Sequence, residues 1–311
     1  MILPVRSAAF VLALLASTRV LAICTPVQHY IYVGNGPLCQ TTSIQTAINN
    51  VVCPDTSVVV SNNLGETYTN QHIQLNGVSA TIAGSTAACN APPVVCDPNI
   101  GCSSGPPAKV AISGDGANPV FYVNGGGYVG FANLVISGGK GADNTLSGGG
   151  GIGVFGSSTS VTVRNVELRN NTGANGGGIA FYGDGSLTLD GVSIHDNSVS
   201  GSGGGVSAYS SFVGHIDVTI ANDPNLTTSI MGNTANTGGG ISVAGNVHLL
   251  AVSANAQIKN NHATQLGGGI AVGGQALADI GLVGNAISGN ISDFSGGGIS
   301  VTPNSGGNAI A

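Results

Sequence analysis

Residues 176–206 read GGGIAFYGDGSLTLDGVSIHDNSVSGSGGGV, which is one full unit of an internal repeat. The Gly-Gly-Gly-aliphatic string that opens the unit occurs six times, and successive aliphatic residues are 27, 27, 35, 29 and 29 positions apart. These aliphatic residues are Ile152, Ile179, Val206, Ile241, Ile270 and Ile299. A flexible glycine linker would not keep this spacing. A repeat of this period predicts a solenoid, in which each unit forms one coil that contacts only its neighbours.

An asparagine accompanies each glycine run after the first. It stands eight or nine residues before the aliphatic residue, and another aliphatic residue lies three positions before it. The asparagines are Asn171, Asn197, Asn233, Asn261 and Asn290. Because equivalent residues of stacked coils form columns, we expect these side-chain amides to hydrogen-bond along the stack.

The quoted unit contains three candidate strands, at 178–182, 186–190 and 192–196. Apolar residues alternate in these segments, and the chain contains 52 glycines, which disfavour helices. Each strand should pair in parallel with its equivalent one coil later, about 4.8 Å away. The sequence therefore predicts an all-β fold, a right-handed parallel β-helix (solenoid). The six aliphatic residues above should form one interior column, and the neighbouring interior column should be Val154, Phe181, Ala208, Val243, Val272 and Val301.

Aromatic residues form an outward column in this arrangement. Phe155, Tyr182 and Tyr209 each lie three residues after an interior position, so they should point outward and stack on adjacent coils. A strip of small residues should run beside them, at Gly153, Ala180, Ser207, Ser242, Ala271 and Ser300. Such a face suits a sugar ring or another β-surface, although an aromatic ladder can also serve only to stabilise a sheet.

Composition limits the classes of function. Only 6% of the residues are charged, compared with about 25% in typical soluble domains. The net charge is −6 with 7 lysines and arginines in total, which gives no basic patch for nucleic acid. The calcium-binding Gly-Gly-x-Gly-x-Asp repeat does not occur, and we expect no metal and no cofactor.

The first 22 residues are typical of a secretory signal peptide. Arg6 supplies the positive start, segment 8–17 the apolar core, and Val20-Leu21-Ala22 a cleavage site. A membrane anchor is the first alternative, but the apolar stretch is short and Arg19 interrupts it. A lipoprotein is the second, but Ile23 stands where that motif needs a small residue. We therefore expect an exported protein, secreted or at the cell surface, with no later membrane-spanning segment.

The cysteines all precede the regular repeat, and on an exported chain their even number indicates disulfides. They are Cys24, Cys39, Cys53, Cys89, Cys96 and Cys102. Segment 41–51 is amphipathic, and we expect it to form a helix, capped by Thr41 or Thr42, that covers the first coil. A disulfide between Cys39 and Cys53 should clamp this helix. Residues 85–107 should form a disulfide-stapled surface loop.

These features predict a single domain over residues 23–311 after the signal peptide. Its first part, 23–115, contains the capping helix, the early coils and the stapled loop, and 116–311 contains the regular coils. After Ile299 only Ser300-Val301-Thr302 can form a strand. We therefore expect an incomplete last coil with an exposed apolar end, which could stack end to end on a partner.

The chain resembles a known superfamily in two groups of motifs. The segments 30–33, 43–48 and 57–60, followed by Gly65 and Tyr68, resemble the opening of pectin-lyase-like right-handed parallel β-helix proteins. The later Gly-Gly-Gly-Ile and Ile-x-x-Asn pairs resemble the Gly-Gly-Ala-Ile and Phe-x-x-Asn repeats of polymorphic outer-membrane proteins and other bacterial surface passengers. This resemblance implies the predicted fold and a place at the cell surface. Aliphatic residues replace the phenylalanine of the repeat.

No catalytic motif of that superfamily is present, because the acidic residues are scattered singly rather than clustered or paired. Arg169, His195 and Lys259 share one outward repeat position and are the weaker polar candidates for sugar contact or acid–base chemistry. Solvated corners are the plainer interpretation. The remaining histidines, His29, His72, His215 and His248, follow no period, and we expect each to be structural or incidental.

The sequence therefore favours a non-catalytic adhesion or carbohydrate-binding module over the alternative, a polysaccharide lyase or hydrolase. The expected ligand-binding residues are Phe155, Tyr182 and Tyr209. The expected partner is a polysaccharide or a cell surface.

Overall fold

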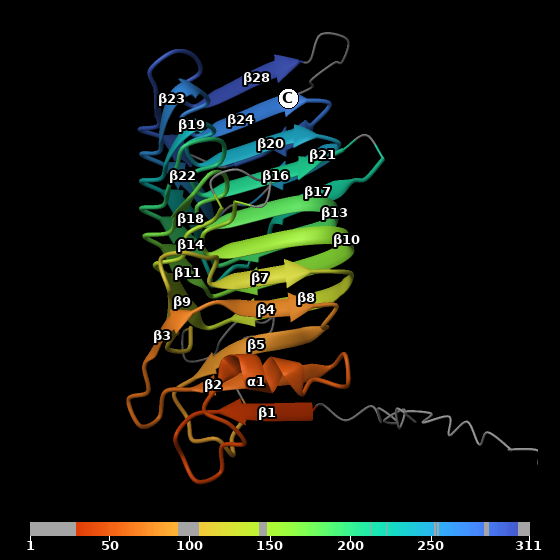
Figure 1. Cartoon of the computed structure of the whole chain (residues 1–311). Coiled ribbons are helices and arrows are strands. Elements are labelled where there is room, and N and C mark those ends of the chain that lie inside the picture. Colours follow the sequence, from red (N-terminus) through yellow and green to blue (C-terminus); the bar gives the residue numbers. More distant parts are fainter. Residues whose placement is uncertain are drawn as a thin grey trace, which may run out of the picture.

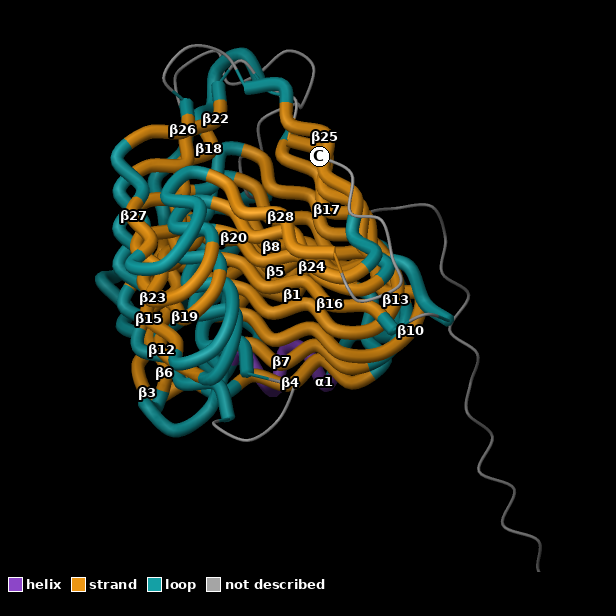
Figure 2. The backbone as a smooth tube through the Cα atoms, turned by 90° about the horizontal axis from the view of Figure 1, so that it is seen from above, coloured by secondary structure: helices purple, strands orange, loops and turns teal. Residues whose placement is uncertain are grey.

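The computed structural model describes residues 29–92, 106–142, 148–211, 213–221, 223–251, 253, 255–282 and 286–303. These residues form a parallel β-solenoid of about 9 turns, with its coils stacked along one axis and almost no helix (Figure 1). Viewed from the end of the stack, the strands of successive coils overlie one another (Figure 2). The predicted all-β fold class is confirmed.

The largest sheet has 15 strands and supplies two faces of the solenoid. The first face contains β4 (Ile73–Asn76), β7 (Phe121–Asn124), the first halves of β10 (Ile152–Arg164) and β13 (Ile179–Asp190), β16 (Val206–Ser210), β20 (Ile241–Gly245), β24 (Ile270–Gly274) and β28 (Ile299–Pro303). The second face contains β1 (His29–Val33), β2 (Thr56–Ser61), β5 (Ala80–Ser85), β8 (Gly127–Ala132), the second halves of β10 and β13, β17 (Ile216–Ile220), β21 (Val247–Ala251) and β25 (Leu277–Ile280).

Two smaller sheets complete the coils, and the second of them is present only in the later coils. The third face is an 8-stranded sheet of β3 (Tyr68–Gln71), β6 (Val110–Gly114), β9 (Leu134–Ser137), β11 (Glu167–Arg169), β14 (Ser193–His195), β18 (Thr228–Met231), β22 (Ala256–Lys259) and β26 (Ile287–Ser288). A 5-stranded sheet contains β12 (Thr172–Gly173), β15 (Ser198–Val199), β19 (Thr234–Thr237), β23 (His262–Leu266) and β27 (Ile291–Ser292).

The predicted strands of the quoted unit differ from the observed ones at one corner. The structure joins the first two into the 12-residue strand β13, because Gly183 (φ 132°) and Gly185 (φ 142°) let the strand bend without leaving the sheet. The turn at Gly191 (φ 60°) does end β13, and β14 begins two residues later.

Both predicted interior columns are confirmed. Ile152, Ile179, Val206, Ile241, Ile270 and Ile299 are paired in register from coil to coil. The first five are fully buried, whereas Ile299 is 37% exposed at the last described coil. The expectation of an exposed, incomplete end also concerns residues 304–311, which lie outside the described part of the chain.

The glycine runs are required by the close approach of successive coils. The first glycine of several runs has a left-handed backbone, as at Gly203 (φ 68°) and Gly267 (φ 63°). The third glycine faces the backbone of the next coil: a Cβ on Gly269 would lie 2.5 Å from the carbonyl oxygen of Gly298. Any side chain at this position would push two coils apart.

The predicted asparagine column is also confirmed, as a continuous hydrogen-bonded ladder. The Nδ2 of Asn197 donates to the Oδ1 of Asn233 at 3.0 Å, and the Nδ2 of Asn233 donates to the Oδ1 of Asn261 at 3.0 Å. Each Oδ1 also accepts the backbone N–H of the preceding asparagine, and Asn233 Nδ2 donates to the Ile194 carbonyl at 2.9 Å. Asn171 and Asn290 extend the ladder at its two ends. The amides thus satisfy the backbone groups of a tightly bent, buried corner.

Helix α1 (Ile44–Asn49) is shorter than the predicted 41–51 segment. Its N-cap is Ser43, rather than Thr41 or Thr42, and the Ser43 Oγ accepts the Thr46 N–H at 3.2 Å. Ile44, Ala47 and Ile48 are buried and belong to the apolar core of the solenoid. The helix lies beside β4, where the first face begins (Figure 1). That this helix caps the first coil stays a prediction.

The predicted disulfide between Cys39 and Cys53 is wrong. Cys39 is bonded to Cys89, with a Cα–Cα distance of 5.1 Å, and Cys53 takes part in a different disulfide. The reason is topological: Cys39 follows β1 and Cys89 follows β5, and these two strands flank β2 in one sheet. Cys24, Cys96 and Cys102 lie outside the described residues, as does most of the predicted stapled loop.

In the described part of the chain, no helix has the length and apolar character needed to cross a membrane.

Replacing Asn233 with alanine should destabilise the solenoid. The change would leave the N–H of Asn197 without its side-chain acceptor and would remove the amide donor to the Ile194 carbonyl in a buried corner, which costs about 3 kcal/mol in free energy of unfolding. Urea denaturation would measure the loss, with the exposed Asn63→Ala variant as control. Equal stability of the two variants would show that the ladder does not hold the coils together.

Two glycines of the same coil provide a matched test of the close-approach argument. Gly269→Ala should lower the free energy of unfolding by about 2 kcal/mol, since its methyl group would overlap the Gly298 carbonyl. Gly273→Ala should change it by less than about 0.5 kcal/mol, because the nearest atom to its new methyl group is 3.6 Å away. Thermal unfolding followed by circular dichroism would compare them. Similar losses in both variants would contradict the argument.

Candidate functional site

The predicted aromatic column exists on the first face. Phe155, Tyr182 and Tyr209 are paired in register on β10, β13 and β16. The ring centroids of Phe155 and Tyr182 are 6.0 Å apart with nearly parallel planes, and those of Tyr182 and Tyr209 are 6.1 Å apart. Tyr209 is 38% exposed, whereas Tyr182 is only 8% exposed and lies between its two neighbours. Tyr182 therefore serves mainly as the centre of the stack, and the accessible surface belongs to the outer rings.

A fourth ring extends this stack, and the sequence analysis missed it. Tyr122 of β7 stacks on Phe155 with a centroid distance of 5.1 Å. In register, Tyr122 is paired with Gly153 rather than with Phe155, so it reaches the column diagonally across a residue that has no side chain. We call Tyr122, Phe155, Tyr182 and Tyr209 the aromatic ladder.

The predicted strip of small residues is in place but is not an open surface. Ala180, Ser207, Ser242, Ala271 and Ser300 are all less than one tenth exposed. The chain folds back over them at the glycine runs, where a Cβ on Gly238 would lie 2.8 Å from the Cβ of Ser242. The Tyr182 hydroxyl also lies 3.4 Å from the Ser207 Oγ. The flat strip expected beside the aromatic residues is therefore covered, and only the ladder itself offers a surface.

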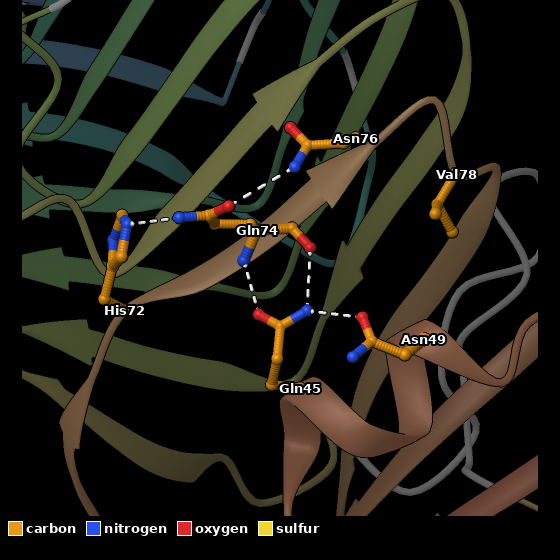
Figure 3. A pocket seen from close by; sticks show the side chains of 6 residues that line it. All are labelled: Gln45, Asn49, His72, Gln74, Asn76 and Val78. Atoms are coloured by element: carbon orange, nitrogen blue, oxygen red, sulfur yellow. Dashed lines mark hydrogen bonds between the residues drawn. The ribbon is translucent and has the colours of Figure 1, made fainter.

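A polar pocket of about 400 Å³ lies on the same face, between α1 and β4. Its lining residues are Gln45, Asn49, His72, Gln74, Asn76 and Val78 (Figure 3). Register connects the pocket to the ladder, because Gln74 is paired with Tyr122 and Asn76 with Asn124, which is in turn paired with Phe155. Pocket and ladder thus form one continuous face parallel to the solenoid axis.

Arg169 and His195 are brought together, but Lys259 is not. All three occupy one column of the third face, and Met231 separates His195 from Lys259. The Glu167 Oε1 lies 2.8 Å from the Arg169 Nε and 3.4 Å from the His195 Nε2. The His195 Nδ1 is 2.8 Å from the Asp196 Oδ2. This group is a partly exposed chain of polar contacts, which supports the plainer interpretation of solvated corners.

The second face holds a cluster of titratable groups that the sequence analysis did not find. The Asp217 Oδ1 lies 3.0 Å from the His215 Nε2 and 3.6 Å from the His248 Nδ1. The His248 Nε2 lies 2.9 Å from the Asp279 Oδ2. We call His215, Asp217, His248 and Asp279 the histidine–aspartate cluster. His215 and His248, which we expected to be structural or incidental, are its centre.

A signal for this cluster was present in the sequence. Asp217 and His248 are 31 residues apart, and so are His248 and Asp279. The same separation joins His262 to Asp293, whose Nε2 and Oδ1 are 2.9 Å apart. Asp217 and His248 are paired directly, because their coil is 31 residues long. The other two contacts are diagonal: a coil of 29 residues pairs His248 with Leu277 and His262 with Ile291, and each aspartate lies two positions further along the strand.

Buried charges form a separate group at the ends of β10 and β13. Arg164 contacts the carboxylates of Asp190 and Asp223, and all three are buried. Burial raises the pKa of Asp190, against the opposing effect of Arg164. The group spans three coils at a closed corner and has a structural role, since breaking such a buried pair is costly.

Within the described residues, no set of three or more histidine, cysteine or acidic side chains is arranged to hold a metal ion. A comparison of the chain with models of protein families, with curated proteins and with solved structures finds no match. The geometry of the described residues therefore carries the functional argument.

The histidine–aspartate cluster should make stability depend on pH. Hydrogen bonds that His215 donates to the Asn246 Oδ1 and the Asp217 Oδ1, together with the charges of Asp217 and Asp184, raise the pKa of His215 above its ordinary value. A raised pKa in the folded state means that protonated His215 adds stability below the pKa of an ordinary histidine, about 6.5. This contribution is lost as the pH rises through the folded pKa. The His215→Gln variant should therefore melt below the wild type at about pH 5.5 and close to it at about pH 8.5.

Asp217→Asn provides the control for this comparison. It keeps the shape of the side chain but removes the charge between the two histidines. The pH dependence of the wild-type melting temperature should weaken in this variant. A constant difference between wild type and His215→Gln at both pH values would contradict the assignment.

Proposed function

We propose that this protein is an exported, non-catalytic binding module that recognises a polysaccharide or a glycan-covered surface through its aromatic ladder. The observation that carries the proposal is the stack of four rings in consecutive coils of one face, with Tyr209 38% exposed at one end. Aromatic rings present large, rigid apolar faces at little cost in conformational entropy, and a sugar ring can lie flat on them. An extended ligand suits this surface, because the rings lie on consecutive coils along the axis.

Export rests on the signal-peptide pattern of residues 1–22, which lie outside the described residues, and is supported by the disulfide between Cys39 and Cys89. Stable disulfides form in oxidising compartments. The family assignment is also a proposal: the parallel β-solenoid is the fold of pectin-lyase-like proteins, and the repeat resembles that of bacterial surface passengers.

The alternative function is a polysaccharide-acting enzyme, and one observation favours it. The histidine–aspartate cluster brings two imidazoles and two carboxylates together on the second face, with contacts of 2.9 Å, 3.0 Å and 3.6 Å. Such groups can transfer protons. Three of them are exposed and His248 is partly exposed, and all four lie on the second face, whereas the pocket lies on the first. An assay for reducing or unsaturated sugars on a polysaccharide panel, with and without calcium, would test this alternative, and product formation abolished by His248→Gln would establish it.

The ladder proposal predicts that Tyr209→Ser weakens glycan binding about tenfold, because truncation of an interface tyrosine typically costs more than about 1 kcal/mol. Tyr209 is a better position for the test than Tyr182, since the latter is buried and its loss would disturb the stack. Affinity electrophoresis through gels that contain single polysaccharides would measure the effect.

Tyr128→Ser is the matched control, because Tyr128 is 45% exposed but lies on the second face. It should leave binding unchanged. If Tyr128→Ser weakened binding and Tyr209→Ser did not, the binding surface would be the second face and the proposal would be wrong.

A further inference from the structure

The polar pocket beside α1 is already organised in the structure. The Gln45 Oε1 accepts the N–H of Gln74 at 2.7 Å, and the Gln45 Nε2 donates to the Gln74 carbonyl at 3.1 Å. One side-chain amide thus makes the two hydrogen bonds that a neighbouring strand would make to this edge of β4. The same Nε2 donates to the Asn49 Oδ1 at 2.9 Å, which fixes Asn49 at the pocket wall.

The opposite wall is oriented by a histidine whose tautomer the contacts define. The His72 Nδ1 lies 2.8 Å from the carbonyl oxygen of Pro119, which can only accept, so Nδ1 carries the proton. The His72 Nε2 is then the acceptor for the Gln74 Nε2 at 3.0 Å. The Gln74 Oε1 in turn accepts from the Asn76 Nδ2 at 3.3 Å. This series of hydrogen bonds determines the positions of the oxygen and the nitrogen in the side-chain amides of Gln74 and Asn76.

The network leaves unused hydrogen-bonding groups on two amides that line the pocket. The Asn49 amide uses its oxygen for Gln45, which leaves its Nδ2 to donate, and the Asn76 amide uses its nitrogen for Gln74, which leaves its Oδ1 to accept (Figure 3). No acidic or basic side chain apart from His72 lines the pocket. Fixed neutral amides of this kind match hydroxyl groups, which both donate and accept, better than they match an ionic ligand.

The position of the pocket determines which part of a ligand it would receive. It adjoins the aromatic ladder through Tyr122 and Asn124, and on the other side it is bounded by α1, which carries Gln45 and Asn49. A linear chain that lies along the ladder would reach the pocket at the helix, and α1 would prevent it from continuing along the axis (Figure 1). The volume of about 400 Å³ lies within the usual range of small-ligand sites.

We propose that this pocket binds the terminal residue of an uncharged, hydroxyl-rich glycan whose following residues lie on the aromatic ladder. The proposal rests on the proposed function, which it deepens by assigning an end-on mode and a neutral ligand class. The non-reducing and reducing ends of a glycan share this chemistry and are distinguished by the experiment below.

The test uses isothermal titration calorimetry of the full chain with neutral linear hexasaccharides: maltohexaose, cellohexaose, xylohexaose and mannohexaose. Asn49→Ala combined with Asn76→Ala should weaken binding about tenfold to a hundredfold, since two hydrogen bonds to the ligand are lost. Asn49→Asp keeps the shape but replaces the donor with an acceptor, and it should weaken binding about tenfold even if the double variant folds poorly. Gln265→Ala, an exposed glutamine on β23, is the control and should bind as the wild type does.

The outcomes separate the two proposals. The hexasaccharide that binds is then tested again after its reducing-end sugar has been converted to the alditol. The alditol should bind more weakly than the original if the reducing end enters the pocket, and equally well if the non-reducing end does. Oligogalacturonate of the same length should bind more weakly than the neutral glycans. Binding that Tyr209→Ser weakens but the Asn49 and Asn76 variants leave unchanged would overturn the pocket proposal alone. Absence of binding to every hexasaccharide would overturn both.

Discussion

Parallel backbone hydrogen bonding between successive coils is the constraint on which the rest of this structure depends. It holds equivalent residues about 4.8 Å apart along the axis, so that every repeated position becomes a column. A column can be apolar and buried, as for Ile152, Ile179 and Val206. It can equally be a line of glycines, a ladder of amides or a stack of aromatic rings. The character of each face is therefore set by one residue per coil.

The same constraint explains how a chain with 6% charged residues buries polar groups. Each coil must turn sharply after the third face, and the turn leaves backbone N–H and carbonyl groups inside. The asparagine ladder satisfies these groups without a charge. Each amide nitrogen donates to a carbonyl of the preceding coil, and each amide oxygen accepts from N–H groups of that preceding coil. Glycine is needed next to the ladder because the backbone of one coil lies so close to the backbone of the next that a Cβ would overlap a carbonyl oxygen. The amide and glycine columns are thus two parts of one corner.

The faces of the solenoid differ in chemistry although they share one backbone geometry. The first face combines the aromatic ladder with a pocket of neutral amides, and the second face carries the histidine–aspartate cluster. Helix α1 gives the first face a defined end, because Gln45 takes the place of a neighbouring strand against β4. The repeated coils therefore present an extended surface, the aromatic ladder, and the helix adds one pocket that occurs at a single position on the same face.

The sequence by itself determined the fold, the two interior columns, the asparagine ladder and the register of Phe155, Tyr182 and Tyr209, because a fixed period places equivalent residues above one another whatever the details of packing. Only the tertiary structure decided the features that depend on neighbours at irregular separations. The Cys39–Cys89 disulfide joins segments on either side of β2, and Tyr122 reaches the ladder diagonally over Gly153. Burial of the small-residue strip arises from the path of the glycine corners, and the pocket arises from a helix that the repeat does not contain. These contacts depend on loop paths and side-chain rotamers, which a linear period does not encode.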